Sequence, residues 1–176
     1  MKKLADSASF GAIRKFDIHT GIDFHCKEGT SVFAMRAGTV RQEIFTGPRA
    51  GSAWWNETYA LLVEDETGVT LYGEILPERK LDLRFNAEHP VSVKVGDCLG
   101  TVMRVLKKNK GAPTSMLHLE RYTSNTKTSV VWNLRTPQPE NLLDPTKEFS
   151  DQELAMLFED ATILSHLITK KVRTNE

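Results

Sequence analysis

Short stretches rich in Val, Ile, Leu, Thr and Tyr recur along the chain, and this pattern constrains the fold more than any other feature of the sequence. Gly, Pro, Asn or Asp residues separate the stretches and indicate turns between them. The predicted strands cover residues 32–36, 39–45, 58–64, 69–75, 91–95, 99–106, 116–122 and 129–134. Such spacing is typical of antiparallel strands in a sandwich or barrel, so the sequence predicts an all-β domain.

The size and the charge of the chain narrow the class of function. Its 176 residues match the length of one domain and suffice to bury a core without disulfide bonds. Lys and Arg total 23 and balance 23 Asp and Glu, so no overall field attracts nucleic acid or an anionic membrane. We therefore expect neither nucleic acid nor a membrane as a partner.

The N-terminus and the cysteines indicate a cytoplasmic location. Residues 5–9 are small or polar, where a signal peptide would need an apolar stretch, and no window approaches the roughly 18 apolar residues of a membrane span. Cys26 and Cys98 are too few for a disulfide framework and are expected to be small buried side chains. Together these features predict a cytoplasmic protein.

The C-terminal part of the chain changes character. Two prolines within residues 136–139 exclude a helix or a central strand there. A helix is predicted to begin after Ser150, which forms a capping box with Glu153. Its apolar face would contain Leu154, Leu157, Phe158, Ala161, Leu164 and Ile168. The sequence thus predicts a domain at 1–147 and a helical extension at 148–176, which either packs on the sheet or binds a partner.

One short segment combines metal-ligand residue types with strand alternation. In residues 18–25 the apolar side chains lie on one face, while His19, Gly21 and Asp23 share the other. Zinc accepts imidazole and carboxylate ligands, and Gly21 leaves room for an ion. A zinc site needs at least one more protein ligand, and alternation in residues 115–120 turns His118 away from the apolar face. We therefore predict a zinc ion bound by His19, Asp23 and His118.

A third patterned segment supplies a candidate catalytic carboxylate. Alternation in residues 69–75 places Val69, Leu71 and Ile75 on one face and turns Tyr72 and Glu74 to the other. If this second face adjoins the metal, Glu74 is a candidate general base for hydrolysis. A role in orienting a ligand histidine, or a plain exposed carboxylate, remains the alternative.

The order and spacing of these motifs resemble those of the lysostaphin-like zinc endopeptidases, which cut peptide crosslinks in bacterial cell walls. The resemblance covers about residues 10–147 and rests on HTGID, EGTSVFAMRAGTV, TLYGEI, VKVGDCLGTV and MLHLE. It implies an antiparallel barrel-sandwich hybrid of the lysostaphin-like type. By matching position it also implies that His19, Asp23 and His118 hold zinc, in agreement with the alternation pattern.

The sequence departs from this family at its two catalytic histidines, which are replaced by Met116 and Glu74. A thioether neither transfers a proton nor donates a hydrogen bond, whereas a glutamate is a competent base. Two functions follow as hypotheses. The first is zinc-dependent hydrolysis of a peptide amide, from a cell wall or another source, with Glu74 as base. The second is an inactive homologue that binds a peptide or a partner protein in its groove, with a structural zinc.

Several other residues suggest secondary roles. His25 shares the face of His19 and is an alternative ligand. The loop with Trp54 and Trp55 either lines a groove or packs beneath the sheet edge. The basic turn at 107–111 is a solvated tip or a contact for a substrate carboxylate. A turn at 93–100 is similar to those of biotin, lipoate and phosphocarrier modules, and this likeness concerns the fold alone. The remaining histidines, His89 and His166, are expected in solvent.

Overall fold

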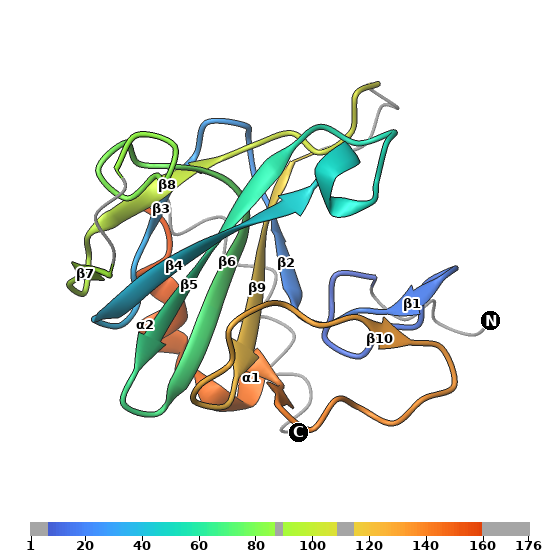
Figure 1. Ribbon diagram of the computed structural model, residues 1–176. Coiled ribbons are helices and arrows are strands. Elements are labelled where there is room, and N and C mark those ends of the chain that lie inside the picture. The colour runs from blue at the N-terminus through green and yellow to red at the C-terminus, as the bar shows by residue number, and fades with distance from the viewer. Residues whose placement is uncertain (1–6, 87–89, 109–114, 160–176) are drawn as a thin grey trace.

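The computed structural model describes residues 7–86, 90–108 and 115–159, and its regular structure is mostly antiparallel β-sheet (Figure 1). The hydrogen-bonded path through the larger sheet is β11 (Leu142–Leu143), β9 (Met116–Tyr122), β6 (Gly68–Pro77), β5 (Thr58–Asp65), β4 (Gly38–Thr46) and β7 (Val91–Val93). Off this path, β2 (Ile22–His25) pairs with β9. In addition, β8 (Cys98–Val102) pairs with both β6 and β3 (Ser31–Phe33). The all-β class predicted from the sequence is confirmed.

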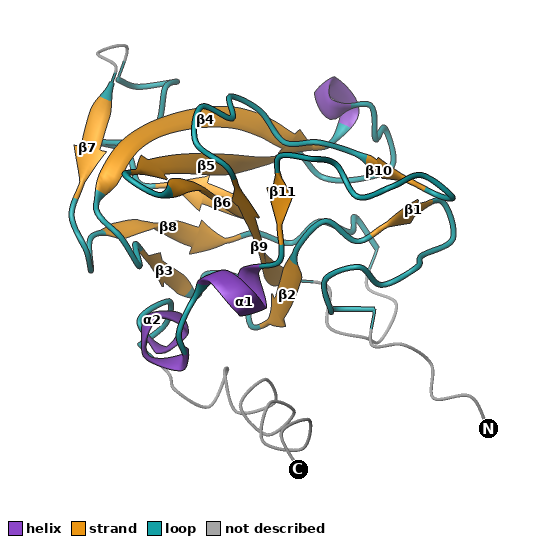
Figure 2. Cartoon of the chain, turned by 90° about the horizontal axis from the view of Figure 1, so that it is seen from below, coloured by secondary structure: helices purple, strands orange, loops and turns teal. Residues whose placement is uncertain are grey.

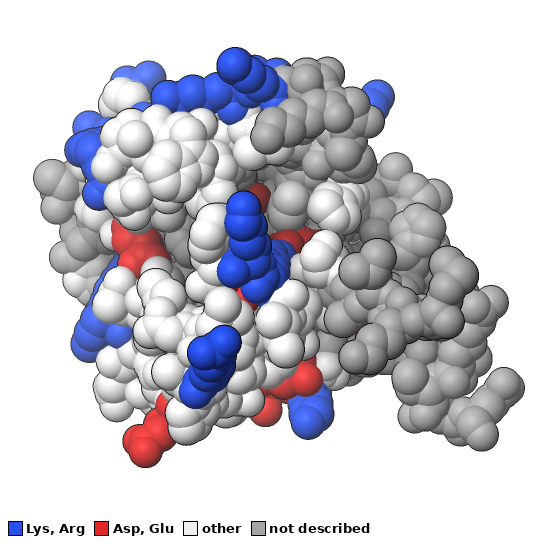
Figure 3. Space-filling view, turned by 90° about the vertical axis from the view of Figure 1, so that its right-hand side faces the viewer, with Lys and Arg blue, Asp and Glu red and all other residues white. Residues whose placement is uncertain are grey.

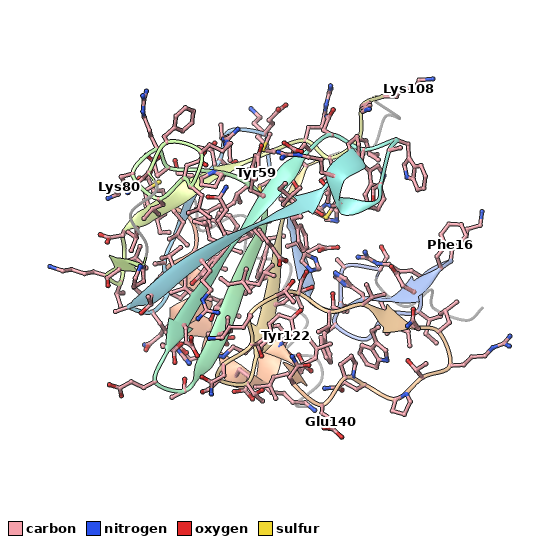
Figure 4. All side chains as sticks on the ribbon, in the orientation of Figure 1. Phe16, Tyr59, Lys80, Lys108, Tyr122 and Glu140 are labelled. Atoms are coloured by element: carbon pink, nitrogen blue, oxygen red, sulfur yellow. The ribbon has the colours of Figure 1, made fainter. Side chains whose placement is uncertain are left out.

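A second, two-stranded sheet stands to one side of the larger one (Figure 1). It consists of β1 (Asp17–Ile18) and β10 (Trp132–Asn133). Phe16 at its outer end is exposed and points away from the rest of the chain (Figure 4). The strand predicted at 129–134 is therefore only two residues long. The apolar residues of this segment, which suggested a longer strand, serve packing instead, since Val130 and Trp132 contact the smaller hydrophobic core.

Strand alternation divides the buried side chains between two cores. The larger core takes Leu61, Tyr72 and Ile75, and the smaller core takes Leu62 and Leu71. The prediction that Tyr72 shares a polar face with Glu74 is wrong, because Tyr72 is buried in the larger core and its hydroxyl accepts a hydrogen bond of 3.0 Å from the Met35 amide. Both faces of β6 are covered by a hydrophobic core. The alternation of polar and apolar residues in this strand therefore does not indicate which face is exposed to solvent.

The alternation of β6 also changes along the strand. Ile75 shares a core with Tyr72 and lies on the face opposite Leu71, contrary to the prediction. The cause is Glu74, whose φ of 64° breaks the regular strand and shifts the register between β5 and β6. A one-residue shift moves the following side chains to the other face.

Two short helices lie on one side of the larger sheet, near β2 and β3 (Figure 2). They are α1 (Pro145–Glu148), which the sequence analysis missed, and α2 (Asp151–Ala155); a 3-10 turn, η1, covers Pro48–Ala50. The predicted capping box is confirmed, since Ser150 accepts from the Glu153 amide and Glu153 accepts from the Ser150 amide.

The prediction of a continuous helix from Ser150 to Ile168 is wrong beyond its first turn, because α2 ends at Ala155. The Leu157 carbonyl accepts a hydrogen bond of 3.0 Å from the amide of Phe33, the last residue of β3, so the backbone at Leu157 pairs with the sheet and does not continue the helix. The side chains of Leu154, Leu157 and Phe158 are nevertheless buried in the larger core, so this part of the extension packs on the sheet. The rest of the predicted apolar face, Ala161, Leu164 and Ile168, lies outside the described residues.

Two smaller expectations need correction. The strand predicted at 99–106 is regular only as β8, and isolated bridges continue it by pairing Arg104 with Ser115 and Leu106 with Trp55. Both cysteines are half-buried free thiols, whereas full burial was expected. Among the described residues, no helix is long and apolar enough to cross a membrane.

Candidate metal centre

The pairing of β2 with β9 positions two of the three predicted ligands. Asp23 lies directly opposite His118 in this antiparallel register, so their side chains share one face of the sheet. His19 comes from the segment between β1 and β2, because the continuous strand expected at 18–25 is interrupted at residues 19–21. All three side chains are almost fully buried.

The three ligand atoms converge. His19 Nε2 lies 3.1 Å from Asp23 Oδ1 and 3.1 Å from His118 Nδ1, and His118 Nδ1 lies 2.7 Å from Asp23 Oδ1. Zinc bonds of about 2.0–2.1 Å in tetrahedral geometry separate ligand atoms by roughly 3.3 Å. Two sides of the observed triangle are therefore within about 0.2 Å of this separation, and the third, between His118 Nδ1 and Asp23 Oδ1, needs to open by about 0.6 Å around an ion.

The hydrogen bonds on the outer side of the two imidazoles determine which ring nitrogens are unprotonated and direct a lone pair at the centre. His19 Nδ1 lies 2.9 Å from the Ser9 carbonyl oxygen, and His118 Nε2 lies 2.8 Å from Glu120 Oε1. Both partners only accept, so these nitrogens carry the protons. In the neutral rings, His19 Nε2 and His118 Nδ1 then point lone pairs at the Asp23 carboxylate. Such a cluster requires a cation, either a metal ion or a proton, and its donor set suits zinc.

In the metal-free chain a proton on His118 meets this requirement. Burial opposes the charged ring, but hydrogen bonds to Asp23 and Glu120 outweigh it and raise the pKa of His118 to about 10. Burial likewise opposes the Asp23 carboxylate, yet its hydrogen bonds to His118 and His19 hold its pKa well below the usual range. A protonated His118 therefore supplies the positive charge between the Asp23 and Glu120 carboxylates near neutral pH.

Zinc binding should therefore release one proton and strengthen with pH. Below a pKa of about 10, the free chain carries the His118 proton and the zinc-bound chain does not, while Asp23 is ionised in both. We expect the zinc association constant to rise about tenfold per pH unit between about pH 6 and 8. Competition titration with a chelator of known pH dependence measures this slope. A pH-independent constant would contradict a protonated His118.

Glu120 holds the outer side of His118, a role that the sequence analysis did not assign. Its carboxylate accepts hydrogen bonds from the Thr20 and Tyr122 hydroxyls as well as from His118. Burial tends to raise the pKa of Glu120, but the contacts with His118 lower it overall. The signal was present in the sequence, because positions 118 and 120 share one face of a strand.

Replacing Glu120 should weaken zinc binding without touching a ligand. In Glu120→Gln the amide oxygen still accepts from His118, but the negative charge that increases the basicity of the ring is lost. We expect a zinc Kd about 10–100-fold higher. Glu43→Gln is the matched control, since the hydrogen bonds of Glu43 within the described part of the chain come from Thr128 and Ser129 and not from His19, Asp23 or His118. Equal effects of the two changes would contradict the assignment.

Arg14 fixes the orientation of Asp23. Its Nη2 lies 2.6 Å from Asp23 Oδ2 and donates to the Ser7 carbonyl oxygen at 2.8 Å. Oδ2 is thereby held outside the centre, and Oδ1 is left facing the two histidines. No local pattern in the sequence indicates this pair, because Arg14 precedes the strand and reaches Asp23 only through the fold.

Two glycines allow the backbones to approach the centre closely. A Cβ on Gly21 would lie 2.3 Å from the Leu119 carbonyl oxygen and 3.0 Å from His118 Cε1. The space at Gly21 is thus taken by β9 and the His118 ring, whereas the sequence analysis assigned it to an ion. Gly73 lies opposite His118 in β6, and a Cβ there would lie 2.7 Å from Phe45. The Phe45 ring can therefore pack against His118, with their centroids 5.4 Å apart.

Glu74 lies where β6 changes neighbours, from β9 at Gly73 to β8 at Ile75. Its left-handed φ of 64° turns its side chain toward the centre, although Glu74 is not among the clustered ligand atoms. Glu74 Oε2 is buried and has no hydrogen-bond partner among the described residues. Burial, with a smaller contribution from Asp23, raises the pKa of Glu74 to about 8 against the opposing charges of His118 and Arg14. Glu74 is therefore a carboxyl group of unusual basicity beside the cluster.

The cluster opens onto a groove formed by two adjoining pockets that share Arg14, Trp55 and Glu74 as lining residues. The larger pocket, of about 390 Å³, is also lined by His19 and His118. The smaller, of about 290 Å³, is also lined by Asp23, His25, Met116, Val105 and Leu106. On the face that carries β1 and β10, basic side chains lie beside recessed acidic ones (Figure 3).

The other predicted site residues have distinct placements. Met116 lines the smaller pocket opposite His25 in the β2–β9 register, and His25 is outside the ligand cluster among the described residues. Trp55 lines both pockets, whereas Trp54 is 68% exposed and lines neither. Lys107 donates to the Ala53 carbonyl oxygen. Residues 109–111, His89 and His166 lie outside the described residues.

Together, this fold and this cluster define a mostly β protein with a candidate metal centre beside a groove. No protein-family model matches the chain, and no curated protein matches it either.

Proposed function

We propose that the protein is a zinc-dependent hydrolase of peptide amides with a fold of the lysostaphin-like type. The convergence of His19 Nε2, Asp23 Oδ1 and His118 Nδ1 beside a groove carries this proposal. The motif resemblance supports it, since the same three positions match the ligands of that family. Two imidazoles and one carboxylate are a donor set that zinc accepts, and three protein ligands leave a coordination position for substrate or water.

The groove residues divide the chemistry. A bound zinc ion would supply Lewis acidity, which polarises an amide carbonyl and makes water a stronger acid. Glu74 then accepts the proton of the attacking water and returns it to the leaving nitrogen. Its buried, unpartnered Oε2 and its raised pKa suit both transfers. Arg14 lines both pockets and contributes a positive charge to the groove, which stabilises a developing negative charge.

Met116 favours a second candidate function. It stands at the position of a family histidine, and its thioether donates no hydrogen bond to an oxyanion. A groove with this residue could bind a peptide or a partner protein without cleaving it, while zinc clips β2 to β9. The two candidates differ in one observable, which is turnover.

The test uses the full chain loaded with zinc, a defined mixture of synthetic peptides and purified peptidoglycan, with products identified by mass spectrometry. The proposal predicts new amino termini that disappear on chelation, return with zinc and are missing for His19→Ala. Asp17→Ala is the control, because Asp17 lines the larger pocket outside the ligand cluster. If the zinc-loaded chain binds peptides but cleaves none of them, the hydrolase proposal is wrong and the peptide-binding function is supported.

A further inference from the structure

The smaller pocket combines an apolar wall with polar lining residues, among them His25, which lies opposite Met116 in the β2–β9 register. Its apolar lining consists of Trp55, Val105, Leu106 and Met116, and its polar lining includes Asp23 and Glu74. The polar residues belong to the candidate centre or border it. A ligand in this pocket therefore contacts both the apolar wall and residues of the candidate centre.

The apolar wall consists of residues from three chain segments that the fold holds together. The Trp55 backbone bridges to Leu106, and Arg104 bridges to Ser115 immediately before Met116. Met116 in turn pairs with His25 in β2. These backbone links give the apolar wall a fixed shape in the sheet, so it is a preformed pocket.

The size of the pocket restricts what it accepts. A volume of about 290 Å³ lies at the lower end of the range for small-molecule sites. It accommodates one large side chain with its adjoining backbone and leaves little room for more. The larger pocket differs in character, since Asp17, Glu43 and Glu120 line it. The two ends of the groove are thus chemically unequal.

We infer that the smaller pocket receives a large apolar side chain, of leucine or phenylalanine size, from the peptide residue adjacent to the cleaved amide. This inference rests on the proposed function for the position of that amide. The apolar wall alone determines the side-chain preference. A large apolar side chain removes the apolar surface of Trp55 and Met116 from water, whereas a glycine or a charged residue leaves that surface exposed.

The experiment measures binding and cleavage separately. Capped pentapeptides Gly-Gly-X-Gly-Gly, with X as Leu, Phe, Gly, Asp or Lys, are titrated against the full chain with zinc and after chelation, by isothermal calorimetry. Each peptide is then incubated with the zinc-loaded chain and analysed by mass spectrometry. We expect the Leu and Phe peptides to bind at least about tenfold more tightly than the Gly peptide, with or without zinc.

Neighbouring residues of the same type give matched controls. Trp55→Ala should remove most of the preference, and Trp54→Ala should retain it because Trp54 lines neither pocket. Met116→Glu should shift the preference from Leu to Lys, a gain that misfolding does not produce. Met156→Glu, at an exposed methionine in the turn after α2, should leave the Leu preference intact.

The outcomes separate this inference from the proposed function. A Leu and Phe preference without cleavage supports the pocket and contradicts the hydrolase. Cleavage with equal binding of all five peptides supports the hydrolase and overturns the pocket. Loss of preference in Trp54→Ala as large as in Trp55→Ala would also overturn it.

Discussion

Glu74→Gln should lower kcat for peptide cleavage by about a hundredfold to ten-thousandfold while zinc remains bound. The amide of glutamine has the same shape as the carboxyl group but accepts no proton at neutral pH. Glu74 is not among the clustered ligand atoms, so the zinc content should be unchanged. Steady-state kinetics with metal analysis of the same sample measure both quantities.

The pH profile adds a readout that a structural role would not change. The wild-type rate should rise with pH as the Glu74 carboxyl group ionises. The charge of the bound zinc favours the ionised form, so the rise should level off below the pKa of about 8 that burial gives Glu74 in the metal-free chain. Glu66→Gln, at an exposed glutamate that lines neither pocket, is the control and should retain both kcat and the pH profile. Turnover that survives in Glu74→Gln with an unchanged profile would exclude Glu74 as the base.

Arg121→Met should lower the free energy of unfolding by about 3–5 kcal/mol. Arg121 is completely buried, and its guanidinium donates to Asp65 at 2.9 Å, to Thr70 at 2.9 Å and to Thr67 at 2.6 Å. It also lies over the Phe149 ring at 5.4 Å, which links β9 to the end of α1. Its removal leaves the Asp65 carboxylate short of its main counter-charge in a site with little water.

Urea denaturation tests this effect against an exposed pair of the same kind. Arg41 lies 3.9 Å from Glu64 with 43% of its side chain exposed, so Arg41→Met should cost less than about 1 kcal/mol. Adding Asp65→Leu to Arg121→Met should recover part of the lost stability, because no unpaired charge remains. A single-variant loss as small as that of Arg41→Met would show that the buried pair contributes little.

Sequence periodicity predicted most of the strands and the three residues that cluster at the candidate centre. Alternation placed His19 and Asp23 together and turned His118 to the polar side, and the structure brings these three atoms within hydrogen-bonding distance. Alternation failed where both faces of a strand are buried, as at Tyr72. In such a strand the contrast between polar and apolar positions no longer indicates which side faces water.

The parts that the sequence could not predict depend on contacts between distant segments. Arg14 reaches Asp23, and Ser9 reaches His19, from an irregular segment without periodicity. The left-handed conformation of Glu74 arises where β6 exchanges β9 for β8, a change of partner that no local pattern encodes. Similarly, the capping box gave the start of α2, whereas its end follows from pairing of Leu157 with β3.

The central claim is that His19, Asp23 and His118 form a zinc site. Its most direct test is the metal content of the full chain, purified without a histidine tag and offered zinc, measured by elemental analysis beside Asp23→Ala and the control Asp17→Ala. We expect about one equivalent of zinc in the wild type and in Asp17→Ala, and almost none in Asp23→Ala. Little zinc in the wild type, or equal zinc in Asp23→Ala, would contradict the metal centre and with it the hydrolase.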